Sequence, residues 1–164
     1  MYAYVRSNSI RYVDPTGLAT TVIITYDYGI GSHAAVYTDH GFENGPFIYD
    51  PAGSYPGANP NIDARGSGDL FTNNNANLSA YTAFQRSTGS DVTTYTFDTT
   101  PDQEAAIEKA AEAEGGAQPF FCADHVSNAI RGIGPFSDLP HFYRPGGLGS
   151  ALGGLPGVVV RQVP

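Results

Sequence analysis

One side chain in this sequence could act as a strong nucleophile. Cys122 is the chain's single cysteine, and it follows Pro119-Phe120-Phe121 at the predicted start of a helix. At that position the positive end of the helix dipole lowers the pKa of a thiol and favours the thiolate. A free cysteine is also among the most buried residue types, so a structural role is the alternative. The choice between the two depends on a nearby base.

His33 is the predicted base, and Asp50 is the predicted third member of the site. His33 opens a predicted strand, 33–38, directly after a glycine-rich turn, and Asp50 ends the next predicted strand, 46–50. If the two strands form a hairpin, the two side chains are cross-strand neighbours. The carboxylate can then fix the imidazole tautomer and stabilise its cation. The alternatives are a surface histidine at a strand entry and a structural aspartate before a proline.

Strand alternation predicts how the nucleophile and base meet. It places His33, Ala35 and Tyr37 on one face of the sheet, where small neighbours leave room for a helix end. We expect the helix start at Cys122 to dock on that face, with the thiol roughly 3–4 Å from an imidazole nitrogen. The glycine- and asparagine-rich segment 54–77 is expected to be a long loop that borders the resulting cleft.

The other histidines are weaker candidates. His125 lies three residues after Cys122 and is an alternative base, although such a rigid pair seldom leaves room for a substrate. His40, in a predicted hairpin loop, and His141 are expected to be structural or at the surface. No spacing typical of a zinc or calcium site is present, and neither phosphate-binding glycine motif occurs. The sequence therefore predicts neither a metal nor a cofactor.

The surrounding pattern predicts an α+β fold, with a mostly antiparallel sheet packed by two main helices. The first helix, 101–114, has Thr100 as N-cap, Pro101 at its first position and Gln103 completing a capping box. The second, 122–131, carries one apolar stripe. Residues 144–157 are interpreted as a glycine-rich connector. The predicted strands, rich in β-branched and aromatic residues, are 20–28, 33–38, 46–50, 92–98 and 158–163.

The composition and net charge of the chain limit the kinds of partner that we expect. The formal net charge is −8, with a single lysine and no cluster among the arginines, so we expect no nucleic-acid partner. One cysteine excludes a disulfide within the chain. The sequence has no run of 18 apolar residues, so we predict no transmembrane segment. Residues 1–18 lack the apolar core of a signal peptide.

The N-terminal segment resembles the end of an Rhs-repeat core, the shell of a polymorphic toxin. The residues that carry the resemblance are Tyr2-Ala3-Tyr4-Val5, Asn8 and Tyr12-Val13-Asp14-Pro15-Thr16-Gly17-Leu18. Pattern alone would make this segment a simple hairpin. The resemblance implies that residues 1–18 end the shell, with self-cleavage after Leu18, and that residues 19–164 are the toxin domain. Asp14 would be one of two aspartates needed for that cleavage, and the other would lie upstream.

The order His33, Asp50, Cys122 resembles circularly permuted papain-like folds, the relatives of NlpC-type peptidases and lecithin–retinol-acyltransferase-like proteins. The resemblance covers roughly residues 30–135, and the helix Cys-Ala-Asp-His-Val-Ser-Asn-Ala-Ile-Arg adds to it. It implies a catalytic cysteine, a base histidine and a polar third residue. Many such relatives have asparagine directly before the cysteine, whereas this chain has Phe121.

Together these resemblances imply a secreted antibacterial effector that acts inside a target cell as a cysteine peptidase or amidase. The implied substrates are peptidoglycan, a protein or a lipid ester, with peptidoglycan favoured. The implied partners are a cognate immunity protein, the Rhs shell and the secretion machinery, for example a type VI system. Two alternatives stay open: a non-hydrolytic toxin such as an ADP-ribosyltransferase, and a noncatalytic binding module.

Overall fold

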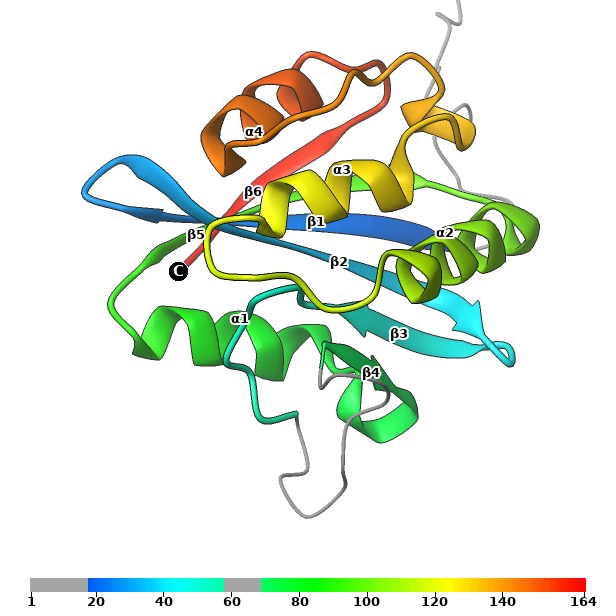
Figure 1. Cartoon of the computed structure of the whole chain (residues 1–164), viewed down its shortest axis with the longest axis horizontal. Helices are drawn as coiled ribbons and strands as arrows, with labels where there is room; N and C mark the ends of the chain where they lie inside the picture. The colour runs from blue at the N-terminus through cyan, green and yellow to red at the C-terminus, as the bar shows by residue number, and fades with distance from the viewer. Residues whose placement is uncertain (1–17, 58–68) are drawn as a thin grey trace, which may run out of the picture.

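The computed structural model describes residues 18–57 and 69–164. Its main feature is a six-stranded sheet in the order β4-β3-β2-β1-β5-β6, in which every neighbouring pair is antiparallel (Figure 1). The strands are β1 (Ala19–Asp27), β2 (Ile30–Phe42), β3 (Gly45–Tyr49), β4 (Leu70–Thr72), β5 (Asp91–Asp98) and β6 (Val159–Val163). The predicted α+β class and mostly antiparallel sheet are confirmed.

Helices cover both faces of the sheet. They are α1 (Leu78–Ser87), α2 (Pro101–Glu114), α3 (Cys122–Ile130) and α4 (Pro145–Gly153), with short 3-10 turns η2 (Asn73–Asn75) and η3 (Gly134–Phe136). The helices α2, α3 and α4 lie on one side of the sheet and α1 on the other (Figure 1). The sheet is therefore the middle layer between two separate groups of apolar side chains.

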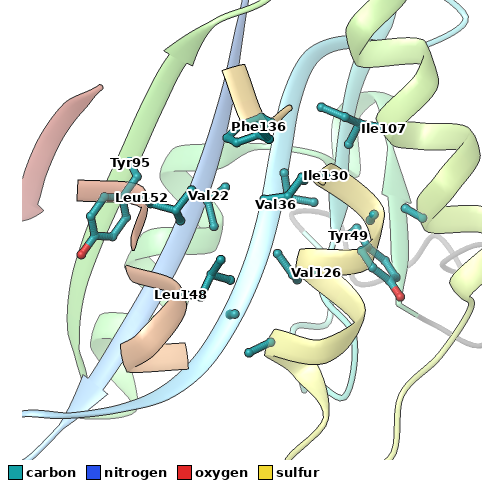
Figure 2. Packing of buried hydrophobic residues seen from close by; sticks show 14 of the residues in the cluster. Val22, Val36, Tyr49, Tyr95, Ile107, Val126, Ile130, Phe136, Leu148 and Leu152 are labelled. Carbon is teal, nitrogen blue, oxygen red and sulfur yellow. The ribbon is translucent and has the colours of Figure 1, made fainter. Parts of the chain in front are cut away.

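The larger apolar cluster lies under α3 and α4. Figure 2 shows Val126 and Ile130 of α3 beside Val36 of β2, and Leu148 and Leu152 of α4 near Val22 of β1; all six side chains are fully buried. The smaller cluster packs Ile23, Ala35 and Ile48 against Tyr81 of α1. Burial of these side chains fixes where α1 and α3 begin and end relative to the sheet.

Both predicted helices are present. The N-terminus of α2 has the predicted capping box, in which Thr100 accepts from the backbone N–H of Gln103 and the Gln103 side chain accepts from the backbone N–H of Thr100. The N-terminus of α3 is at Cys122 itself. The residues before Leu18 that carry the Rhs resemblance, and the predicted hairpin among them, are residues 1–17, which lie outside the described residues, as do residues 58–68 of the predicted loop.

Three sequence interpretations were wrong. The connector at 144–157 contains α4, whose glycines are tolerated because Leu148 and Leu152 are buried. The loop at 54–77 contains β4 and η2, and α1 follows it, so four helices rather than two pack on the sheet. The predicted hairpin loop around His40 is strand: β2 runs to Phe42, and the turn is only Glu43 and Asn44, both at positive φ.

Candidate active site

The hairpin of β2 and β3 brings His33 to Asp50. Val36 pairs with Tyr49 in this hairpin, so Asp50 comes directly after the last paired position. The register of β2 against β1 shifts beside His33, because Thr25 pairs with His33 and Tyr26 pairs with Gly31. A bulge of this kind changes where a side chain points. His33 Nε2 lies 2.5 Å from Asp50 Oδ1, so the predicted contact is present.

A second donor holds the same carboxylate. The Tyr81 hydroxyl of α1 donates to Asp50 Oδ1 at 2.6 Å, and Gln85, one turn later, donates its Nε2 to the Tyr81 oxygen at 3.0 Å. Asp50 and Tyr81 are both buried. Gly53 leaves the space that the carboxylate needs, since a Cβ there would lie 1.8 Å from Asp50 Oδ2. The orientation of Asp50 is therefore set from two sides.

Cys122, the first residue of α3, is the third member of this site. The thiol interacts with the His33 side chain and with the backbone of Ala34 and Ala123, and each of these neighbours lowers its pKa. Because Asp50 occupies Nε2 of His33, Nδ1 is the nitrogen that remains for the thiol. The structure thus brings Cys122, His33 and Asp50, which are far apart in the sequence, into one cluster.

The docking face differs from the one predicted. The apolar stripe of α3 packs with Ala34 and Val36, whereas Ala35 packs on the opposite side with Tyr81. His33, Ala34 and Ala35 pair in regular register with Thr25, Ile24 and Ile23, so the alternation holds, and only the face predicted for the helix was wrong. The helix therefore sits on the other face, and its first residue meets the imidazole at the end of the strand.

The electrostatics favour a thiolate–imidazolium pair. Burial raises the pKa of Cys122, but the hydrogen bond and charge of His33 outweigh it, and the net pKa lies below the ordinary value of a thiol. Burial lowers the pKa of His33, but its hydrogen bonds to Asp50 and Cys122 outweigh this, and the net pKa is about 10. Burial and the nearby Asp50 raise the pKa of Tyr81, so its hydroxyl stays protonated and can donate.

An open cleft of about 540 Å³ reaches the thiol. It is lined by residues 30–32 of β2, by residues 143–147 at the start of α4, and by Phe120 and Cys122. Cys122 itself is only 2% exposed, so its thiol lies at the floor of the cleft. A smaller polar pocket of about 260 Å³ includes His33, Ser32 and Ser54, and Ser32 borders both. Of the described residues in the predicted loop, Ser54 borders this second pocket and none lines the first.

Two glycines bring the start of α4 against the start of β2. A Cβ on Gly31 would lie 2.2 Å from the backbone nitrogen of Gly146. Such a separation is far below van der Waals contact, so only glycine fits at position 31. This close approach of the two backbones forms one side of the cleft beside Cys122.

The remaining histidines have other partners. Nδ1 of His125 lies 3.3 Å from the Tyr49 hydroxyl and 3.7 Å from Glu114 Oε2. Nε2 of His141 contacts Asp124. The backbone N–H of His40 donates to Glu104 at 2.5 Å. No described contact joins any of these histidines to Cys122, so the alternative base His125 is not placed with the thiol. Within the described ranges, no three His, Cys, Asp or Glu side chains are placed to hold a metal ion.

Sequence reasoning missed Tyr81 and Gln85. They are one turn apart on α1, and the buried face of that helix consists of Tyr81, Thr82 and Gln85. A helix with polar residues on its buried face lacks the apolar periodicity by which such helices are predicted. Asn77 was the available signal, since its side chain caps α1 by accepting from the N–H of Ala80.

Comparisons with protein-family models, curated protein sequences and solved structures gave no match to this chain. The Rhs and permuted papain-like resemblances therefore remain hypotheses based on the residues quoted for them. Among the described residues, no helix has the length and apolar character needed to cross a bilayer.

Proposed function

We propose that this protein is a cysteine hydrolase of the peptidase or amidase type, with Cys122 as nucleophile, His33 as acid and base, and Asp50 as the residue that orients His33. The observation that carries the proposal is that His33, hydrogen-bonded to Asp50, lies against the Cys122 thiol at the floor of an open cleft and that this series lowers the pKa of the thiol. A buried core cysteine needs neither a histidine partner nor a cleft, so the series favours the catalytic role.

The reaction follows from the charges in the site. The Cys122 thiolate attacks a carbonyl carbon, and negative charge develops on the carbonyl oxygen. The first turn of α3 has no side-chain cap, so its backbone N–H groups are available to stabilise that oxygen. The His33 imidazolium then gives its proton to the leaving amine or alcohol, leaving a thioester on Cys122. His33, now neutral, deprotonates a water molecule that hydrolyses the thioester and restores the thiol.

The biological setting of this proposal comes from the N-terminal resemblance alone. In that setting residues 19–164 are the toxin released from an Rhs shell, exported by a secretion system and delivered into a competing bacterium. The substrate class named first is peptidoglycan, with a protein or a lipid ester as the alternatives. A cognate immunity protein would then protect the producing cell by blocking the cleft.

The test is expression of the chain in a bacterial host, in the cytosol and, with an added export signal, in the periplasm. We expect growth arrest in the compartment that holds the substrate, and loss of arrest for Cys122→Ala and His33→Gln. His40→Gln is the matched control, because the side chain of His40 lies outside the site. Co-expression of the neighbouring open reading frame is expected to restore growth.

One result would contradict the proposal directly. If Cys122→Ala is as toxic as the unchanged protein while equally abundant, the thiol is not the nucleophile. A non-hydrolytic toxin, such as an ADP-ribosyltransferase, would then be favoured. If no version is toxic in either compartment, trapping decides: a reactive ester must acylate Cys122 in the folded protein, and failure to do so contradicts the proposal.

A further inference from the structure

Large apolar side chains around the cleft at Cys122 are exposed rather than buried. Ile30, Phe120 and Tyr143 border it and are 72%, 91% and 68% exposed. They come from three separate parts of the chain, namely the start of β2 and the segments before α3 and α4. Large apolar side chains gathered in this way commonly mark a binding surface. Phe120 also has a φ of +75°, a costly conformation for a residue other than glycine.

Among the described residues that line the cleft, Arg144 has the one side chain that always carries a charge, and none is an aspartate or glutamate. Arg144 is exposed, and within residues 18–57 and 69–164 its side chain has no hydrogen bond or ion pair. A guanidinium binds a carboxylate or a phosphate through paired hydrogen bonds. In a chain of net charge −8, this cation beside the nucleophile gives the cleft a local preference for anions.

We propose that the cleft selects substrates in which the scissile amide or ester lies beside an apolar group and an anionic group, a carboxylate or a phosphate. Phe120, Ile30 and Tyr143 contact the apolar group, and Arg144 binds the anion. Arg144 is thus the residue that determines specificity. This inference rests on the proposed cysteine hydrolase and deepens it by naming the substrate class.

The experiment measures alkylation of Cys122 and needs no knowledge of the natural substrate. Four probes share an iodoacetyl group, from which the thiolate displaces iodide. They are N-iodoacetyl-phenylalanine, its phosphonate analogue, N-iodoacetyl-phenylalaninamide and N-iodoacetyl-glycinamide. Because Cys122 is the single cysteine, mass spectrometry of the intact protein follows one reaction. Each rate is divided by the rate with free N-acetylcysteine, which removes differences in intrinsic reactivity.

Two arginine variants are compared with the unchanged protein. Arg144→Gln removes the cation in the cleft, and Arg161→Gln on β6 removes an exposed cation that does not line it. We expect at least one anionic probe to react faster than the phenylalaninamide probe, by roughly threefold, as for an exposed charge pair. Arg144→Gln should abolish that preference, measured as the ratio of the anionic-probe rate to the neutral-probe rate, and Arg161→Gln should retain it. The faster of the two anionic probes identifies carboxylate or phosphate.

The apolar part has its own comparison. The phenylalaninamide probe should react faster than the glycinamide probe, and Phe120→Ala should reduce the difference. Equal normalised rates for the charged and neutral probes, or a preference that Arg144→Gln leaves intact, would overturn the assignment of Arg144. Equal rates for the two neutral probes would overturn the apolar site. A thiol that reacts at neutral pH no faster than N-acetylcysteine with every probe would instead count against the proposed hydrolase itself.

Discussion

Tyr81 and His33 share one oxygen atom of Asp50: the Tyr81 hydroxyl donates to Oδ1 at 2.6 Å, and His33 Nε2 lies 2.5 Å from the same atom. The two side chains come from α1 and β2. The carboxylate between them is buried, so each donor compensates part of its lost hydration. The hydrogen bonds that start at His33 thus continue through Asp50 to two residues that were not predicted, Tyr81 and then Gln85.

Tyr81→Phe is expected to weaken the site without removing it. Loss of Tyr81 as a donor leaves the Asp50 carboxylate less firmly oriented toward His33, so Asp50 supports the His33 cation less well and the pKa of the Cys122 thiol rises. The shift should be up to about one pH unit, within the usual strength of a hydrogen bond to a charged group. The measurement is the pH dependence of Cys122 alkylation by iodoacetamide. Tyr95→Phe is the control, since that hydroxyl pairs with Tyr26 instead; equal pH profiles for both variants would assign Tyr81 a purely structural role.

The titration of His33 should be displaced far from that of an ordinary histidine. Its pKa of about 10 means that folding stabilises the protonated form. This contribution to stability is therefore complete below the unfolded value, roughly 6.5, and is lost as the pH rises through about 10. Nuclear magnetic resonance of the imidazole nitrogens should show one histidine that still holds both protons at pH 8. If all four histidines are neutral at that pH, the thiolate–imidazolium pair does not exist.

Asp50→Asn should move the same titration downward. An amide carries no charge, so the two favourable effects of Asp50 on His33, its hydrogen bond as an anion and its negative charge, are both lost while burial still lowers the pKa. The Cys122 thiolate should become less populated at neutral pH, and alkylation at pH 6 should slow. The rate of substrate turnover should fall further, by on the order of 10²- to 10⁴-fold, because the wrong imidazole tautomer is also favoured. The acidic control is Asp91→Asn, which removes an exposed carboxylate paired with Arg86.

Local signals predicted the parts of the site that depend on one element each. Cys122 begins a helix with a strong apolar stripe, and His33 lies near the start of a strand, which begins three residues earlier than predicted, so both placements could be derived approximately from periodicity. The contact of His33 with Asp50 followed from assuming a hairpin between consecutive strands, which is the commonest arrangement.

Features that depend on long-range packing could not be derived in this way. Which face of the sheet α3 covers depends on the apolar side chains of several strands, and α3 packs on the face of Ala34 and Val36, opposite to the one expected. The helix α4 contains four glycines and forms because Leu148 and Leu152 are buried against the sheet, which outweighs poor helix propensity. Arg144 precedes this helix, so its place in the cleft could not be predicted either.

Because Gly31 and Gly146 approach closely, Gly31→Ala and Gly146→Ala should have different effects on stability. A Cβ on Gly31 would lie 2.2 Å from the Gly146 nitrogen, and backbone on both sides cannot rotate away as a side chain can. Gly31→Ala should therefore lower the free energy of unfolding by about 1–3 kcal/mol, as overpacking does. A Cβ on Gly146 meets its nearest atom, the Gly31 nitrogen, at 3.6 Å, which is ordinary contact.

Gly146→Ala is thus the matched control, and it should leave stability within about 1 kcal/mol of the unchanged protein, in the stabilising direction that alanine favours within a helix. Urea unfolding measures both variants. Gly31→Ala should also move the start of α4 away from β2 and carry Arg144 with it, so the preference of Cys122 for anionic probes should fall while its reaction with iodoacetamide persists. If Gly31→Ala is as stable as Gly146→Ala and keeps that preference, the two backbones do not touch and the cleft has a different wall.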